Sequence, residues 1–309
     1  MQRVPNPYRK ITKRFLSLGA VGWVWQIDDE IALKFPRHSP SDEFVHEKDI
    51  YDTFDRHHQP CPHVLQSFYR TEICLFLQYL PGGSLLDRLQ SNQTREKHEV
   101  ISVNRLEDRR LIERWTTELC AASAWLETLG LVHGDLRPAN MLLDKQDHLK
   151  LADFDSVARI GDTALGGAPP WARLRPESAT GAFGVYGPET EQFAIGSVVY
   201  YMTRGFEPYE GPEQSDWPVG VAVDLWKMQK FPEVRQDDAL EGLALSCWRG
   251  SFASLRLLQV AAMMLPGSED VAVAVDWSAE RHLEMGEKCK ALLEQGLAGG
   301  AGRNIKQYM

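Results

Sequence analysis

The sequence predicts an α+β protein in which a strand-rich N-terminal part precedes a larger helical part. Three observations carry this prediction. Residues 15–36 place aromatic and β-branched residues on both sides of the acidic turn 28–30, a pattern typical of a β-hairpin. Residues 73–80 form a continuous apolar run of strand length. Residues 105–129 and 193–205 have the periodicity or length of helices instead, and the first of these ends at a glycine.

The composition of the chain limits its possible partners and its cellular compartment. The chain has 309 residues, enough for one large domain or two lobes. Its net charge of −9 argues against nucleic acid or an anionic membrane as the main partner. The five cysteines are scattered, odd in number and contain no CxxC pair, which predicts an intracellular, cytoplasmic protein, with the nucleus as a second possibility. The N-terminus shows no signal peptide, and no apolar run reaches the length of a membrane span.

The stretch 131–155 carries the chemistry. It holds Asp135, Asn140 five residues later, and Asp153 after an apolar hairpin. One carboxylate of such a set can orient or deprotonate a hydroxyl. The asparagine and the other carboxylate can hold Mg²⁺ against phosphate oxygens, because Mg²⁺ prefers oxygen ligands and usually shares its shell with phosphate.

This stretch, LVHGDLRPANMLLDKQDHLKLADFD, resembles the catalytic and metal-binding loops of protein kinases. The resemblance implies that Asp135 accepts or orients the proton of a substrate hydroxyl, with Arg137 beside the transferring phosphate. Asn140 and Asp153 would hold Mg²⁺. Leu142 would form the floor beneath the adenine of ATP.

Two letters depart from the family pattern. Gly134 replaces the arginine of H-R-D, and Asp155 replaces the glycine of D-F-G. In the family, that arginine pairs with a phosphate on the activation loop, so Gly134 predicts an activity that needs no activation-loop phosphorylation. Asp155 adds a negative charge beside Asp153, which could repel ATP or help to bind a cation.

A lysine that ends an apolar strand is the next signal. Lys34 closes the run Ile31-Ala32-Leu33, and a buried ammonium needs an anionic partner. The run resembles the V-A-I-K strand of protein kinases, which implies that Lys34 grips the α- and β-phosphates and that Ala32 borders the nucleotide. The following helix, residues 43–54, has one mainly apolar face that carries Glu47, the expected partner of Lys34, with Glu43 one turn earlier as the fallback.

Two further segments complete the nucleotide site by resemblance. Gly19, Gly22 and Val24 match the kinase glycine-rich loop, although Ser17 stands in place of its first glycine. Glycines here let the backbone approach phosphates closely. The apolar strand 73–80 resembles the kinase hinge, which implies that the backbone from Gln78 to Leu80 contacts adenine.

The segments between and after these motifs are less regular. Residues 91–99 are polar and predict a loop, and residues 155–187 predict an irregular activation and substrate-docking segment. Gly187-Pro188-Glu189 sits where A-P-E is expected, but unusually close to the start of the next helix. There Glu191 replaces the aspartate that anchors the catalytic loop in the family, and simple helix capping is the alternative. The end of the chain predicts one amphipathic helix, near residues 278–295, before a glycine-rich stretch.

The resemblance implies a bilobal protein-kinase-like fold with a small β-rich N-lobe and a larger helical C-lobe. The expected boundaries are an extension at 1–13, the N-lobe at 14–80, the C-lobe at 81–265 and a C-terminal helix with a flexible tail at 266–309. H-G-D and the segments TEQFAIGS, GFEPY and CW resemble fungal protein-kinase-like proteins. The expected function is an ATP- and Mg²⁺-dependent protein kinase acting on protein serine or threonine. A small-molecule phosphotransferase of the aminoglycoside or choline kinase type, and a pseudokinase that serves as a binding scaffold, are the alternatives.

Overall fold

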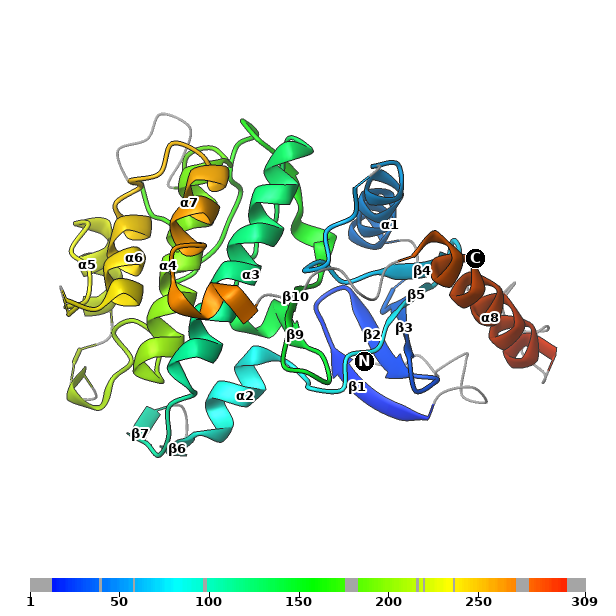
Figure 1. Cartoon of the computed structure of the whole chain (residues 1–309), viewed down its shortest axis with the longest axis horizontal. Helices are drawn as coiled ribbons and strands as arrows, with labels where there is room; N and C mark the ends of the chain where they lie inside the picture. Colours follow the sequence, from blue (N-terminus) through cyan, green and yellow to red (C-terminus); the bar gives the residue numbers. More distant parts are fainter. Residues whose placement is uncertain are drawn as a thin grey trace. The chain divides into compact units, whose positions relative to one another are not determined.

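The structure is a computed structural model that describes residues 13–38, 41–57, 59–96, 99–175, 183–214, 217–218, 220–235, 237–270 and 278–298. It divides into two compact units. The first unit comprises the described residues of Met1–Pro81, Asp153–Asp155 and Ala274–Met309, and the second those of Gly82–Ala152 and Ser156–Val273. Figure 1 shows a strand-rich and a mainly helical part. The predicted α+β class, with a strand-rich N-terminal part and a larger helical part, is confirmed.

The first unit is built on a five-stranded antiparallel sheet in the order β1-β2-β3-β5-β4. In its register Val24 faces Lys34, and Ala32 faces Leu77. The predicted hairpin corresponds to the pair β2–β3. The strands are β1 (Arg14–Leu18), β2 (Gly22–Gln26), β3 (Ile31–Pro36), β4 (Ser67–Arg70) and β5 (Leu75–Gln78).

Helix α1 (Asp42–Asp55) begins where the sequence provides a cap. The side chain of Ser41 accepts a hydrogen bond from the Phe44 N–H at 3.2 Å, which satisfies one of the unpaired donors at the helix start. The buried face of α1 is the predicted one and consists of Phe44, Glu47, Ile50, Tyr51 and Phe54. This helix therefore carries one carboxylate into an otherwise apolar interior.

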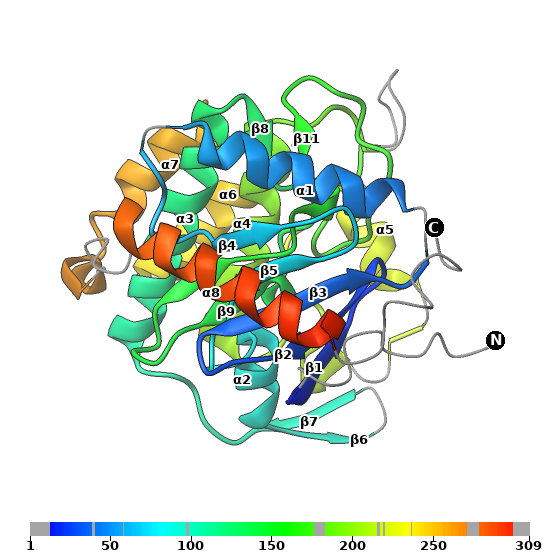
Figure 2. The ribbon, with the colours of Figure 1, turned by 90° about the vertical axis from the view of Figure 1, so that its right-hand side faces the viewer.

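Helix α8 (Ala279–Ala298) packs on the sheet of the first unit, although it lies more than 200 residues after β5 in the chain. Figure 2 shows it lying across the strands. Its Met285 and Cys289 are buried in one cluster with Leu33 and Phe76, and Leu292 and Leu293 lie against that cluster. Leu283 is 67% exposed, so it does not belong to the packing face.

The second unit is mainly helical. Its helices are α2 (Leu85–Ser91), α3 (Arg109–Thr128), α4 (Pro188–Arg204), α5 (Val221–Lys227), α6 (Ala239–Trp248) and α7 (Leu255–Ala262). Its strands pair as β6 (Gln93–Glu96) with β7 (Glu99–Val103), β8 (Leu131–Val132) with β11 (Ala158–Arg159), and β9 (Met141–Leu143) with β10 (Leu149–Leu151). Short 3-10 turns are η1 (Pro138–Asn140), η2 (Phe154–Ser156, which spans both units), η3 (Pro212–Gln214) and η4 (Pro266–Asp270). Among the described helices, none has the length and apolar character to cross a bilayer.

The segment 91–99, expected to be a loop, instead contributes to the β6–β7 hairpin. Its polar side chains form hydrogen bonds and an ion pair with residues 201–210 of the same unit. Gln93 donates to the Gly205 carbonyl and to the Tyr201 hydroxyl, and Arg95 pairs with Glu210. These contacts reach more than 100 residues along the chain, so local polarity was a poor guide to the structure here.

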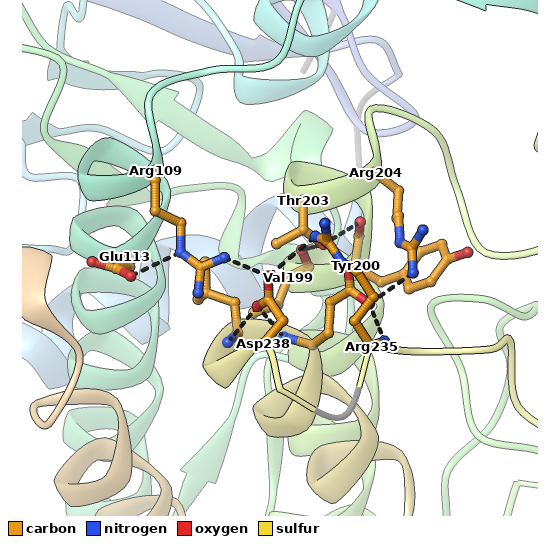
Figure 3. Close-up of polar contacts among 10 residues, drawn as sticks. Arg109, Glu113, Val199, Tyr200, Thr203, Arg204, Arg235 and Asp238 are labelled. Carbon is orange, nitrogen blue, oxygen red and sulfur yellow. Dashed lines mark hydrogen bonds and ion pairs between the residues drawn. The ribbon is translucent and has the colours of Figure 1, made fainter.

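An ionic network ties the helices of the second unit together (Figure 3). Arg109 on α3 bonds Glu113 at 2.8 Å and Asp238, at the start of α6, at 2.6 Å. Arg204 at the end of α4 and Arg235 both bond the fully buried carboxylate of Glu241. Each buried carboxylate has charged partners, which offsets the cost of removing it from water.

Candidate active site

Lys34 is held between two carboxylates in the first unit. Its Nζ lies 2.7 Å from Glu47 Oε2 and 2.6 Å from Asp153 Oδ1, and only 5% of the residue is exposed. Burial alone would lower the pKa of Lys34, but the two carboxylates raise it well above its ordinary value. Burial raises the pKa of Glu47 to about 7, and the ammonium opposes that rise. The arrangement fixes a permanent positive charge at one point of the unit.

Asp153 is positioned by its own backbone conformation and by the packing of the next residue, Phe154. Its φ of 67° is in the left-handed region, which is uncommon outside glycine and turns the backbone sharply. The next side chain, Phe154, is fully buried and packs edge-on against Tyr51 and Phe54 of α1, with ring centroids 5.5 and 5.0 Å apart. Because α1 also carries Glu47, the same helix places both partners of Lys34.

The glycine-rich segment approaches Lys34 closely. A Cβ on Gly22 would lie 2.9 Å from the Phe35 carbonyl and 3.2 Å from Lys34 Cγ, so any larger residue would press on the lysine stem. Gly19 donates its N–H to the Gly22 carbonyl at 2.9 Å and forms the turn between β1 and β2. Val24 and Ala32 lie on the adjacent strands, and Ala32 is buried.

Hydrogen bonds to neighbouring segments fix the backbone at the end of β5 and directly after it. Gln78 donates its N–H to the Gln66 carbonyl at 2.9 Å, and Tyr79 donates to the Glu30 carbonyl at 2.8 Å. Leu80 is buried directly after them. The resemblance assigns the contact with adenine to this short segment.

Residues 133–140 of the second unit, the loop that resembles the kinase catalytic loop and keeps that name below, bring Asp135, Arg137 and Asn140 together. The amide Nδ2 of Asn140 donates to the Asp135 carbonyl at 2.9 Å and to the Asp135 carboxylate at 2.8 Å. Arg137 Nε lies 3.0 Å from the same carboxylate. Since the amide nitrogen of Asn140 faces Asp135, the orientation leaves its carbonyl oxygen as the acceptor on the opposite side.

His133 is part of the framework of this loop. It is fully buried, its Nε2 lies 3.0 Å from the Ala152 carbonyl, and its Nδ1 accepts the Asp135 N–H at 3.3 Å. These bonds place the proton on Nε2 and link the loop to the strand before Asp153. On β9, Leu142 is half-buried and forms an isolated bridge with Ser84.

Glu191, on the first turn of α4, holds the backbone of the catalytic loop. Its two carboxylate oxygens accept the N–H groups of His133 at 2.8 Å and Gly134 at 3.2 Å. Because both oxygens accept from the loop, the carboxylate of this buried residue does more than cap its own helix. The helix itself starts at Pro188, after Gly187, so the segment that resembles A-P-E and the helix start coincide.

Glu191 should make stability depend on pH. Burial raises its pKa to about 7, against the lowering effect of the two backbone donors. Because this folded-state pKa exceeds the ordinary 4.5, the carboxyl's contribution to stability is complete below pH 4.5 and is lost as the pH rises through about 7. Glu191→Gln cannot lose a proton at this position. As the pH rises from about 5 to about 8, we expect its free energy of unfolding to increase by about 2 to 3 kcal/mol relative to that of wild type.

Denaturant unfolding at a series of pH values measures this difference. The glutamine amide has one hydrogen-bond acceptor fewer than the carboxylate, which lowers the unfolding free energy of the variant equally at every pH. The readout is therefore the difference between the two proteins in how the unfolding free energy changes with pH. Glu213→Gln, at an exposed position of the same unit, is the control for the replacement of a glutamate by glutamine. Parallel curves for wild type and Glu191→Gln would contradict the assignment.

Gly134 is required by the backbone that Glu191 holds. Its φ is 80°, and a Cβ at this position would lie 2.4 Å from the Ser156 carbonyl oxygen. Any side chain, including the arginine of H-R-D, would both strain the backbone and meet that carbonyl. The departure from the family pattern therefore has a steric reason in this chain.

A pair of alanine variants tests this reason. Gly130 also has a positive φ, 72°, but nothing lies within 4 Å of its Cβ position. Gly130→Ala should cost about 1 kcal/mol of stability through the backbone alone. Gly134→Ala should cost about 2 kcal/mol more, because the clash adds to the backbone strain. Equal unfolding free energies for the two variants would show that the Ser156 carbonyl moves aside at no cost.

The structure also shows contacts that sequence reasoning missed. Arg173 and Arg175, both in the irregular segment before α4, pair with Glu189, the first of them at 2.8 Å. The two arginines of the sequence RLRPES favour an acidic partner, but nothing in their spacing identifies that partner. The hydroxyl residues Ser178 and Thr180 of that segment lie outside the described residues.

The protein kinase domain family model matches residues 26–263, which include Lys34, Glu47, Asp135, Asn140 and Asp153. The chain belongs to the protein kinase family. Its kinase domain contains both the lysine clamp of the first unit and the catalytic loop of the second.

The kinase is also similar to curated proteins of the same family. It is 30% identical to human Rho-associated protein kinase 1 over 159 residues, which are 48% of this chain and 11% of that protein. It is 26% identical to the serine/threonine-protein kinase GD17699 of Drosophila simulans over 193 residues, which are 59% of this chain and 24% of that protein. The chain thus spans about a tenth to a quarter of the length of these relatives.

Proposed function

We propose that this kinase is an ATP- and Mg²⁺-dependent enzyme that phosphorylates protein serine or threonine residues, and that it belongs to the fungal protein-kinase-like branch with an H-G-D loop. The observation that carries this proposal is the clamp of Lys34 between Glu47 and Asp153. A buried ammonium with two carboxylate partners is costly to maintain, and the motif that Lys34 resembles uses its lysine to grip the phosphates of ATP.

Asp153 and Asn140 offer oxygen donors of the type that a phosphate-bound magnesium ion prefers, and we propose that both would hold it. Asp153 supplies a carboxylate that is 33% exposed, and Asn140 has a carbonyl oxygen turned away from Asp135. Among the residues described, no group of three or more His, Cys, Asp or Glu side chains is arranged to hold a metal by itself. In such sites the protein usually supplies only one or two oxygen ligands, and phosphate oxygens and water supply the others.

Each of the predicted site residues named below then has a role in the transfer. Bound MgATP supplies the phosphoryl group and part of the charge neutralisation. Lys34 holds the α- and β-phosphates, and Gly19 and Gly22 let the backbone approach them. Asp135 orients the acceptor hydroxyl and takes up its proton, while Arg137 faces the transferred phosphoryl group. The rate enhancement comes from positioning and from charges fixed in advance.

The preference for serine or threonine rests on two supports. Arg137 stands two residues after Asp135, where kinases of this preference carry a lysine, and the Drosophila relative is named a serine/threonine-protein kinase. We infer an intracellular, cytoplasmic location, with the nucleus as an alternative, from the odd and scattered cysteines.

Transfer of labelled γ-phosphate tests the proposal. Incorporation into a protein acceptor as phosphoserine or phosphothreonine is the expected result, with ATP and Mg²⁺ both required. Incorporation into choline or an aminoglycoside alone would favour a small-molecule phosphotransferase. No incorporation, despite an ATP- and Mg²⁺-dependent rise in melting temperature, would favour a scaffold that binds nucleotide without turnover.

A further inference from the structure

Helix α8 completes the first unit from outside the matched kinase domain, which ends at residue 263. Its Met285 and Cys289 share a buried cluster with Leu33 and Phe35 of β3. Side chains alternate between the faces of a strand, so Lys34 points to the other face. Helix α8 therefore packs on the side of the sheet opposite the lysine clamp.

The same helix forms ion pairs with the acidic turn between β2 and β3. Lys288 Nζ lies 2.5 Å from Asp28 Oδ1 and 3.6 Å from Glu30 Oε2, and Arg281 Nη2 lies 2.5 Å from Glu30 Oε1. The pKa of Asp28 is lowered despite its partial burial, because Lys288 donates to it. Two cations on one helix face thus hold two carboxylates of one short turn.

That turn is bonded directly to the segment assigned to adenine. The carbonyl oxygen of Glu30 accepts the N–H of Tyr79 at 2.8 Å, between Gln78 and Leu80. A side chain and the backbone of a single residue therefore join α8 to this segment. Movement of the turn would move the Tyr79 amide, because the hydrogen bond links two backbones and not two flexible side chains.

We propose that α8 positions the adenine-binding backbone through Glu30, so that Arg281, Lys288 and Glu30 are positioning residues for the nucleotide. The assignment of adenine to residues 78–80 rests on the proposed function. The mechanical link from α8 to Tyr79 does not, because it is made of contacts within the first unit. The two parts can be tested separately.

The test compares two variants of the full chain. Arg281→Ala/Lys288→Ala removes both cations that reach the turn. Lys290→Ala is the matched control, since this lysine lies on the same helix but pairs with Glu287 and lies over the Tyr69 ring instead. All three side chains are partly exposed, so each variant should fold.

Hydrogen exchange at the Tyr79 amide needs no nucleotide. We expect exchange about three- to tenfold faster in the double variant and unchanged in Lys290→Ala, because partly exposed ion pairs have modest energies. The Michaelis constant for ATP should rise by about threefold, because the nucleotide-binding arrangement of residues 78–80 also loses the modest energy of these ion pairs, while kcat stays the same. Arg281→Lys/Lys288→Arg should restore both readouts. In a Glu30→Gln background, removing Arg281 should add little, because the two act through one contact.

Unchanged exchange at Tyr79 in the double variant would overturn the link. So would an equal effect of Lys290→Ala, which would indicate a general loosening of α8. A wild-type chain that binds no ATP would refute the proposed function, while faster Tyr79 exchange in the double variant would still support the link. Faster exchange with an unchanged Michaelis constant would show that the link exists but does not set nucleotide affinity, which would overturn the positioning role.

Discussion

Asp135→Asn should slow phosphoryl transfer by at least about 100-fold while leaving nucleotide binding and folding intact. The asparagine has nearly the same shape and keeps an oxygen for the Asn140 amide. The bond from Asn140 to the Asp135 backbone carbonyl, 2.9 Å long, does not involve the side chain at all. The variant loses the negative charge that attracts the hydroxyl proton, and with it the partly exposed ion pair to Arg137. We expect kcat to fall by at least about 100-fold, the usual range for loss of a general base.

The controls separate this loss from damage to the fold. The Asp135 side chain is 33% exposed, so the unfolding free energy should change by less than about 1 kcal/mol. The rise in melting temperature with ATP and Mg²⁺ should match that of wild type. Asp224→Asn, at a carboxylate of the same unit that is 63% exposed, should transfer phosphate normally. Equal labelling by wild type and Asp135→Asn would refute the role assigned to Asp135.

Local sequence was sufficient where the chemistry depends on neighbours in the chain. Lys34 ends a strand whose other residues are apolar, and Glu47 is the acidic residue on the buried face of the next helix. A buried charge needs an opposite charge, so the two features together indicated the pair that the structure contains. Asp135 and Asn140 are five residues apart, and a short 3-10 turn is enough to bring them together.

Sequence failed where the partner lies far along the chain. The periodicity of residues 278–295 predicted an amphipathic helix but not the surface that it covers, and Lys288 and Asp28 are 260 residues apart. Leu283 of that helix is 67% exposed, whereas Met285 and Cys289 are buried against the sheet. For Gly134, the sequence showed a missing arginine, whereas the steric reason lies in the position of a carbonyl 22 residues later.

Lys34→Met should have a second large effect, on stability as well as on transfer. Glu47 is 1% exposed, and within the described part of the chain its carboxylate oxygens have no hydrogen-bonding partner besides the ion pair with Lys34. Removing the ammonium leaves this carboxylate buried and unpaired beside Asp153. Loss of one partner from a buried pair costs about 3 to 5 kcal/mol, less whatever Glu47 recovers by taking up a proton. Phosphoryl transfer should become undetectable, because the phosphate grip is gone.

Adding Glu47→Met to Lys34→Met should separate the two effects. Replacing both members of a buried ion pair by apolar side chains of similar volume is often neutral or stabilising. The free energy of unfolding of the double variant should therefore lie within about 1 kcal/mol of the wild-type value. Its transfer activity should not return. Asp153 does not prevent this recovery, because its side chain is 33% exposed and can be hydrated.

Denaturant unfolding and γ-phosphate transfer, measured on both variants, decide the outcome. If the double variant regained transfer together with stability, Lys34 would be a structural residue and the phosphate grip would lie elsewhere. If Lys34→Met were as stable as wild type, the clamp would contribute nothing to folding and its cost in burial would need another explanation. Stability recovered without activity would show that the chain retains a buried charge pair for phosphate binding, since an apolar pair would fold it equally well.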